Sequence, residues 1–259
     1  MSATVLSVES VGLHFGGISA LSDLSLTLQA GELAGVIGPN GAGKTSLFNI
    51  LSGVYQPSAG NVRVLDRSLA GLKPNAVAAL GLVRTFQNIR LFKELTVLDN
   101  VRLALHGRQS PGLLDSLLRR PSALAAEAGI SRQAEHLLER LELAERGQER
   151  AGDLAYGDQK KLEIARALAA GPKILLLDEP AAGMNPAESA WLKSAISAIR
   201  RDFNLSVLLI EHDMSVVMGL CERLVVMDHG QKICEGAPEA VRQDPRVVEA
   251  YLGTRKAGR

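Results

Sequence analysis

The chain has 259 residues, enough for one large domain or two small ones with a buried core of full size. It carries 29 Lys and Arg against 28 Asp and Glu, and the resulting formal net charge of +1 provides no field that would recruit DNA or RNA. Hydrophobic residues make up 46% and aromatic residues only 3%, which is typical of an aliphatic α/β core. This composition excludes a disulfide miniprotein and disfavours a disordered chain or a dedicated nucleic-acid-binding protein.

The sequence contains no segment that resembles a transmembrane helix or a secretory signal. The longest uncharged run, residues 45–62, is interrupted by polar residues, a glycine and Pro57. The N-terminus lacks the basic region and apolar stretch of a signal peptide. Cys221 and Cys234 are solitary, so neither a disulfide framework nor a zinc site is indicated. We therefore expect a cytoplasmic location with free thiols.

The N-terminal part of the chain has the alternation of half-buried strands. Residues 6–11 and 24–28 alternate apolar and polar side chains, and an apolar strand is predicted at 33–37. The pattern changes at residues 131–147, where Ala134, Leu137, Leu138 and Leu141 have helical spacing. An antiparallel β region is therefore followed by a helical insertion of roughly 70 residues, which contains the Pro- and Gly-interrupted segment 108–120, predicted as a loop or short helix pair.

The C-terminal part predicts a parallel sheet. Residues 173–178 and 205–210 are aliphatic at nearly every position, which indicates strands buried on both faces. A hairpin is predicted around His229-Gly230, and Pro238 and Pro245 each mark the start of a helix.

A phosphate-binding loop is predicted at residues 38–45. The segment GPNGAGKT matches the P-loop pattern, follows an apolar strand and precedes a predicted helix. Its glycines allow the backbone N–H groups to surround an anion, Lys44 supplies a cation, and Thr45 offers a hydroxyl to Mg²⁺. The residues expected to contact ATP here are Gly38, Asn40, Gly41, Gly43, Lys44, Thr45 and Ser46.

Two acids end the predicted strand 174–178. In open α/β sheets ligands bind at the carboxyl ends of the strands, where Asp178 and Glu179 are expected to lie. Asp178 is predicted to hold Mg²⁺, directly or through water, and Glu179 to polarise the water that attacks the γ-phosphate.

A third motif, LAYGDQ at residues 154–159, resembles the signature motif of the ATP-binding subunits of ABC transporters. Its small-residue turn before a helix is a second N-terminal anion site. Within that family the sequence most resembles the ATPases of branched-chain amino acid importers. That narrower likeness is carried by RTFQNIRLF at 84–92, LAYGDQKKLEIARAL at 154–168, EPAAGMNP at 179–186, EHDM at 211–214 and YLG at 251–253.

The resemblance implies roles for further residues. Phe15 resembles the aromatic residue that stacks on adenine, although a buried strand residue is an equal alternative. Gln87 resembles the glutamine that touches the metal and the attacking water, and His212 resembles the histidine that reaches the γ-phosphate. Residues 182–185 resemble the loop that crosses the dimer interface. The signature residues, which would bind the ATP of a facing subunit, are Leu154, Ala155, Tyr156, Gly157, Asp158 and Gln159.

Two signature positions depart from the family pattern. Ala155 replaces the usual serine, so a hydroxyl for the opposed γ-phosphate is missing. Asp158 stands where glutamine is common, and its carboxylate would repel an anion unless it turns aside to cap the helix.

The resemblance implies an α/β fold: a P-loop NTPase (RecA-like) core with an N-terminal antiparallel β subdomain and an inserted α-helical subdomain. We expect residues 1–87 and 160–259 to form the core and 88–159 the helical subdomain. The implied function is ATP hydrolysis, with Mg²⁺, that drives uptake of branched-chain or related amino acids from the cytoplasmic face of the membrane. The implied partners are a second ATPase subunit (the same chain or a paralogue), permease subunits and, indirectly, a solute-binding protein.

Two other functions fit the same motifs. One is the ATPase of a lipid or lipopolysaccharide exporter, whose sequences resemble this one in the Tyr-Leu-Gly ending. The other is a soluble ABC ATPase that acts on ribosomes or DNA, although such proteins usually carry two cassettes in one chain. The sequence alone does not select the solute.

Overall fold

A computed structural model describes residues 3–85, 90–109 and 121–252 of the chain. The chain divides into two compact units, Met1–Arg84 with Lys173–Arg259, and Thr85–Pro172. No helix in the described ranges is long and apolar enough to cross a membrane.

The first unit begins with a four-stranded antiparallel sheet in the order β2-β1-β4-β5. Its strands are β1 (Thr4–Phe15), β2 (Ile18–Gln29), β4 (Ala59–Val64) and β5 (Arg67–Ser68). The predicted antiparallel region is confirmed, and its first two strands are longer than the alternating segments suggested. Leucines and valines of β1 and β2 are buried in one core with residues of the second sheet, because alternate side chains point to that face.

The second sheet has six strands in the order β10-β9-β3-β8-β7-β6. They are β3 (Leu33–Ile37), β6 (Leu82–Arg84), β7 (Ile174–Asp178), β8 (Ser206–Ile210), β9 (Arg223–Asp228) and β10 (Gln231–Gly236). Five of them are parallel, and β10 pairs antiparallel with β9. Every residue of β3, β7 and β8 is buried, which confirms that these aliphatic strands lie in the sheet interior.

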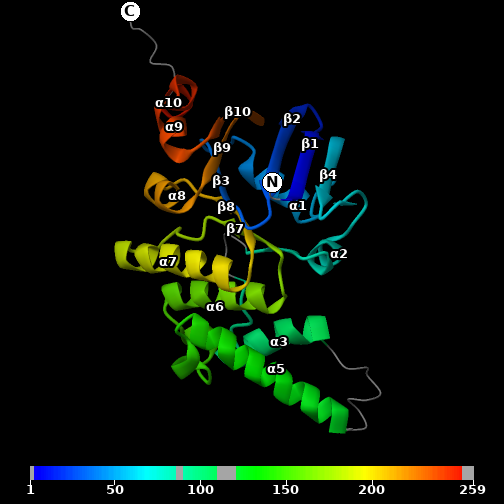
Figure 1. The fold of residues 1–259 in the computed structure, drawn as a ribbon, viewed down its shortest axis with the longest axis vertical. Helices are drawn as coiled ribbons and strands as arrows, with labels where there is room; N and C mark the ends of the chain where they lie inside the picture. Colours follow the sequence, from blue (N-terminus) through cyan, green and yellow to red (C-terminus); the bar gives the residue numbers. More distant parts are fainter. Residues whose placement is uncertain (1–2, 86–89, 110–120, 253–259) are drawn as a thin grey trace, which may run out of the picture. The chain divides into compact units, whose positions relative to one another are not determined.

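Helices cover both faces of this sheet. They are α1 (Lys44–Leu51), α2 (Pro74–Ala79), α7 (Pro186–Asp202), α8 (Met214–Leu220), α9 (Pro238–Gln243) and α10 (Pro245–Leu252). In Figure 1, α7 and α8 lie on one side of the sheet, and α1 lies on the other with β1 and β2. The predicted hairpin and both proline helix starts are confirmed. Parallel strands place the carboxyl ends of β3, β6, β7 and β8 at one edge, where the functional residues gather.

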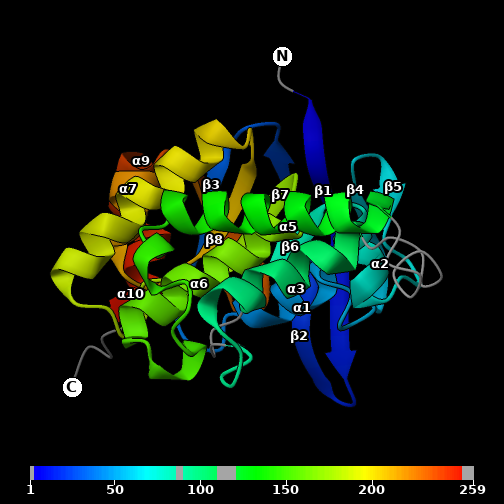
Figure 2. The same ribbon diagram turned by 90° about the horizontal axis from the view of Figure 1, so that it is seen from below.

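The second unit is helical. It contains α3 (Val97–Gln109), α5 (Pro121–Arg140) and α6 (Tyr156–Ala169), with short 3₁₀ turns at Ala144–Arg146 and Ala151–Asp153. Figure 2 shows α3 beside α5, and α6 contacts both helices. The amphipathic pattern at 134–141 is confirmed, since its four apolar residues are buried in α5 and just after it. All of α6 belongs to this unit, whereas the sequence predicts that the core resumes at residue 160.

Candidate nucleotide-binding site

The predicted phosphate-binding loop connects β3 to α1. Gly38, Gly41 and Gly43 have positive φ values of 152°, 83° and 97°. A Cβ atom at Gly38 would lie 2.1 Å from the carbonyl oxygen of Met227, so only glycine fits there. Gly43 is the N-cap of α1, and no side chain caps this helix or places an acid in its first turn. The N-terminal N–H groups of α1 therefore remain available to an anion.

Lys44 is folded over this loop. Its Nζ donates hydrogen bonds to the carbonyl oxygens of Gly38 at 2.7 Å and Pro39 at 2.9 Å. Burial lowers the pKa of Lys44, while the charges of Glu179 and Asp178 act in the opposite direction. The ammonium group thus lies within the electrostatic influence of both acids at the end of β7.

The two acids at the end of β7, Asp178 and Glu179, lie in different environments. Asp178 is 4% exposed, and its Oδ2 accepts a hydrogen bond of 2.6 Å from Arg84 Nη2 at the end of β6. Glu179 has a left-handed backbone with φ 47°, and its N–H donates to the Ile210 carbonyl at 2.9 Å. The side chain of Asp178 is 5% exposed and that of Glu179 is 20% exposed, so the two carboxylates lie in different surroundings.

His212 lies just beyond the end of β8, next to Glu179. Its Nδ1 is 3.9 Å from Glu179 Oε2, and its side chain is 58% exposed. The preceding residue, Glu211, is fully buried and accepts hydrogen bonds from the backbone N–H groups of Ala181 at 2.8 Å and His212 at 3.2 Å. Burial raises the pKa of Glu211, and these hydrogen bonds partly oppose the rise. Glu211 therefore ties the turn after β7 to the turn after β8.

Phe15 is at the exposed end of β1. Phe15 is 47% exposed, so the alternative interpretation as a buried strand residue is wrong. The ring makes an edge-to-face contact with Tyr55, with centroids 5.2 Å apart and planes at 73°. An exposed aromatic face supported by a second ring is suited to stacking on a nucleobase.

The signature motif forms the start of α6 in the second unit. Ala155 is the N-cap, with extended backbone and no side-chain hydrogen bond, while Gln159 Nε2 donates to the Leu154 carbonyl at 2.9 Å. Asp158 does not cap the helix, which corrects the expectation: its carboxylate pairs with Arg146 at 3.3 Å and Lys161 at 3.4 Å. The pairing is possible because these cations flank the first turn, and it compensates the negative charge near the N-terminus of α6.

The structure brings most of the predicted site residues of the first unit to one edge of the six-stranded sheet. The P-loop follows β3, the two acids lie at the end of β7, and His212 lies just after β8. Gln87 lies outside the described residues, as does Gly253 of the Tyr-Leu-Gly ending. Sequence reasoning missed Arg84 and Glu211 as neighbours of the acids, although each stood inside a motif that carried the resemblance.

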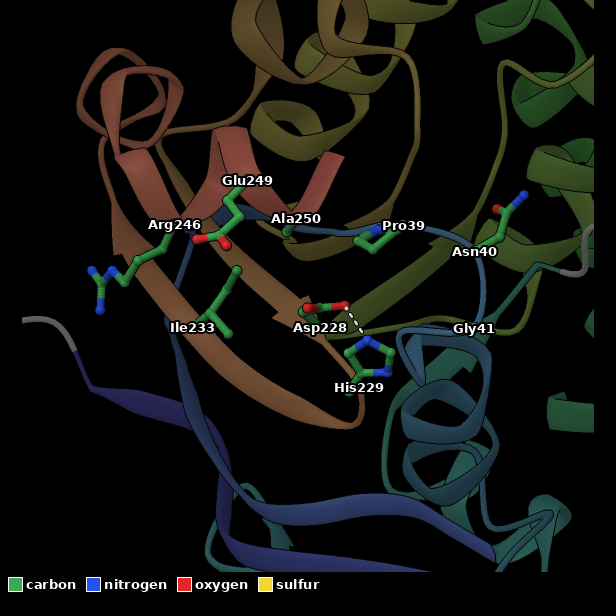
Figure 3. Close-up of a pocket in the computed structure, with 9 residues that line it drawn as sticks. All are labelled: Pro39, Asn40, Gly41, Asp228, His229, Ile233, Arg246, Glu249 and Ala250. Atoms are coloured by element: carbon green, nitrogen blue, oxygen red, sulfur yellow. Dashed lines mark ion pairs between the residues drawn. The ribbon is translucent and has the colours of Figure 1, made fainter. Parts of the chain in front are cut away.

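A pocket of about 600 Å³ is lined by residues of the P-loop, of the β9–β10 hairpin and of α10. Figure 3 shows the residues that line it: Pro39, Asn40, Gly41, Asp228, His229, Ile233, Arg246, Glu249 and Ala250. The Gly230 N–H in the hairpin turn donates to the Ala42 carbonyl at 3.0 Å. Burial raises the pKa of Tyr251, and a hydrogen bond from the Gly38 backbone acts in the opposite direction. The hairpin and α10 therefore both contact the P-loop, which no sequence pattern predicted.

Comparison with protein families assigns the class. The family model described as ABC transporter matches residues 21–182, which include the P-loop, the signature motif and the acidic pair. The chain is an ABC transporter ATPase, a nucleotide-binding cassette with the fold described above.

Comparison with individual relatives shows which group of ABC transporter ATPases the chain is similar to. A second model, described as Branched-chain amino acid ATP-binding cassette transporter, matches residues 231–257. The High-affinity branched-chain amino acid transport ATP-binding protein LivG of Escherichia coli (strain K12) is 45% identical over 98% of this chain and 99% of its own. The corresponding protein BraF of Pseudomonas aeruginosa is 43% identical over the same shares. The ADP conformation of MJ1267, an ATP-binding cassette of an ABC transporter, superposes with a TM-score of 0.84 at 32% identity, over 97% of this chain and 100% of that one. The chain belongs to the branched-chain amino acid transport ATP-binding proteins of the ABC transporter family.

Proposed function

We propose that this chain binds and hydrolyses MgATP to drive the import of branched-chain amino acids through separate permease subunits. The observation that carries the proposal is the P-loop, Asp178, Glu179 and His212 at the ends of neighbouring strands, in a chain 45% identical to LivG over nearly its full length. The relatives favour this function over lipid export and over a soluble ATPase, because they are described as branched-chain amino acid transport proteins.

The donor set suits magnesium. Thr45 supplies a hydroxyl and Asp178 a carboxylate, the hard oxygen ligands that Mg²⁺ prefers, and Gln87 is the third proposed ligand. When bound, the metal neutralises charge on the β- and γ-phosphate oxygens. Lys44 binds the same phosphates, and the glycine N–H groups at the start of α1 surround them. Ser46 and Asn40 complete the phosphate contacts, and Phe15 stacks on the adenine.

The proposed catalytic step uses Glu179 as the group that orients and polarises water. Its carboxylate oxygen, 3.9 Å from His212 Nδ1, accepts a proton of the attacking water, while His212 contacts the γ-phosphate. Gln87 contributes to holding the same water. Each residue orients or polarises a reactant, and no covalent intermediate with the protein is required.

A complete site requires a second ATPase subunit. The signature residues 154–159 carry an uncapped helix N-terminus, which we propose binds the γ-phosphate of ATP held by the facing subunit. Residues 182–185 lie at the proposed dimer interface. The assembly would sit peripherally on the cytoplasmic face of the membrane, with permease subunits and, through them, a solute-binding protein.

The test is uptake of radiolabelled leucine, isoleucine and valine in cells that lack this chain. Wild type should restore uptake, and Glu179→Gln should not, although it should still bind ATP and should hydrolyse it at least about 10²-fold more slowly. The matched control is Glu239→Gln, the same substitution at an exposed position of α9. Uptake that never depends on the chain would refute the substrate, and normal hydrolysis by Glu179→Gln would refute the catalytic assignment.

A further inference from the structure

An arginine that the proposed mechanism does not use is bound to the proposed metal ligand. Arg84 Nη2 lies 2.6 Å from Asp178 Oδ2, and both side chains are only 5% exposed. The two residues end the adjacent parallel strands β6 and β7, where Arg84 pairs in register with Leu176. A charge-assisted hydrogen bond of this length, away from water, fixes the position of the carboxylate.

The guanidinium group is itself held by α1. Its Nη1 donates to Asn49 Oδ1 at 2.8 Å and to Ser52 Oγ at 3.1 Å. Its Cζ atom also lies 5.5 Å from the centroid of the Phe48 ring. Phe48 and Asn49 lie in the helix that begins at the P-loop and carries Thr45 in its first turn, and Ser52 is the C-cap of that helix. Arg84 therefore connects the helix of one proposed metal ligand to the carboxylate of the other.

A planar guanidinium is suited to this connection. It presents donors in a fixed fork and stays charged at any pH the protein encounters, so it can hold Asp178 and α1 in one geometry. The hydrogen bond from Arg84 engages only Oδ2 of Asp178, and Oδ1 is left for a cation or its water. Asp178 also interacts electrostatically with Lys44.

We propose that Arg84 is a positioning residue for magnesium: it holds Asp178 by Oδ2 and sets its place relative to Thr45. The proposal rests on the proposed function, since it takes Asp178 and Thr45 as the metal ligands. Partners in the outer shell of metal sites typically change metal affinity by about 10- to 100-fold when removed. Charge alone predicts the opposite sign, because removing a cation near the carboxylate should strengthen Mg²⁺ binding. The direction of the effect therefore distinguishes positioning from competition.

The experiment measures how much Mg²⁺ strengthens ATP binding, without any turnover. In a Glu179→Gln background, the Kd of a fluorescent ATP analogue is measured with excess Mg²⁺ and with EDTA, and the ratio of the two values is the magnesium benefit. Arg84→Gln should reduce this ratio by about tenfold while leaving the Kd in EDTA nearly unchanged. Arg84→Lys should reduce it by about threefold, because an ammonium is a point charge and cannot reproduce the fork.

The matched control is Arg223→Gln. Arg223 forms a similar pair in the same unit, with its Nε 2.7 Å from Glu32 Oε1 and side chains 20% and 11% exposed. This variant should be less stable but keep the wild-type magnesium benefit, which separates a general loss of stability from an effect on the metal site.

Three outcomes would overturn the inference: an increased magnesium benefit in Arg84→Gln, an unchanged one, or an equal decrease in Arg223→Gln. If Arg84→Gln does not fold, Arg84→Lys decides, and an unchanged ratio in that variant overturns the proposal. The variant Asp178→Asn distinguishes a failure of the proposed metal site from a failure of the proposed role of Arg84. If this variant retains the full benefit, Asp178 is not the metal ligand and the proposed site itself fails. If it loses the benefit while Arg84 variants keep it, only the inference about Arg84 fails.

Discussion

His212 Nδ1 lies 3.9 Å from Glu179 Oε2, although 33 positions separate the two residues in the sequence. They meet because β7 and β8 are adjacent and parallel, with Asp178 in register with Ile210. The turns that follow these strands therefore begin at the same level of the sheet. This register places the proposed base for water and the proposed donor to the γ-phosphate side by side.

The first prediction concerns His212→Ala. We expect turnover of ATP to fall about 10²-fold, because a donor aimed at the γ-phosphate acts chiefly in the transition state. ATP affinity and thermal stability should change little, since the side chain is 58% exposed. Phosphate release, nucleotide binding and Tm are the measurements. A variant that hydrolyses ATP at the wild-type rate would remove His212 from the catalytic residues.

The second prediction compares two glycines of the P-loop. Gly38→Ala should destabilise the protein by more than about 2 kcal/mol, because a Cβ would lie 2.1 Å from the Met227 backbone oxygen. Gly41→Ala meets no atom within 4 Å, so only the positive φ of 83° opposes it, at a cost of about 1 kcal/mol. Denaturant unfolding of both variants tests the ranking. Equal losses would mean that Met227 yields to the added methyl group.

The third prediction concerns the pH dependence contributed by Glu211. Burial raises its pKa above the ordinary value of 4.5, so the folded state holds the proton more tightly than the unfolded state. This contribution to stability is greatest below the unfolded-state pKa and is lost as pH rises from about 4.5 through the raised value. His212 acts on Glu211 electrostatically, and burial followed by the charge of Glu211 raises the pKa of the Cys221 thiol.

Glu211→Gln should therefore remove part of the decline in the free energy of unfolding above pH 4.5. The measurement is urea unfolding at several pH values for wild type, Glu211→Gln and the exposed control Glu239→Gln. Parallel curves for wild type and Glu211→Gln would show that Glu211 is ionised at its ordinary pKa in the folded protein.

The fourth prediction concerns the signature helix. Ala155 has the extended backbone of an N-cap, with φ −58° and ψ 154°, but no side chain that accepts from the helix N–H groups. Ala155→Ser should stabilise the protein by about 1 kcal/mol, because the hydroxyl can accept one of these hydrogen bonds. Slower hydrogen exchange in the first turn of α6 would report this locally. Ala155→Val is the control and should give no gain, and a serine variant with wild-type exchange would contradict the capping argument.

The sequence predicts those parts of the site that depend on neighbours along the chain. The P-loop is recognisable because its glycines, lysine and threonine perform their roles within eight consecutive residues, between a strand and a helix. The buried strands β7 and β8 are recognisable because they lack alternation, and Asp178 and Glu179 follow from the end of one of them. Even the amphipathic helix of the second unit depends only on spacing within two turns.

Contacts between distant segments were decided by the tertiary structure. Arg84 and Asp178 are 94 positions apart and meet only because β6 and β7 are neighbours in the sheet. Phe15 at the end of β1 touches Tyr55 in the loop between α1 and β4. The pairing of Asp158 depends on Arg146 in a preceding turn. A pattern in the sequence records which face a residue presents, whereas its partner depends on strand order and register, which are set by the packing of the whole unit. The amino-acid sequence by itself therefore determined the class of chemistry and the residues proposed to touch ATP, and only the fold decided which side chains hold them in place.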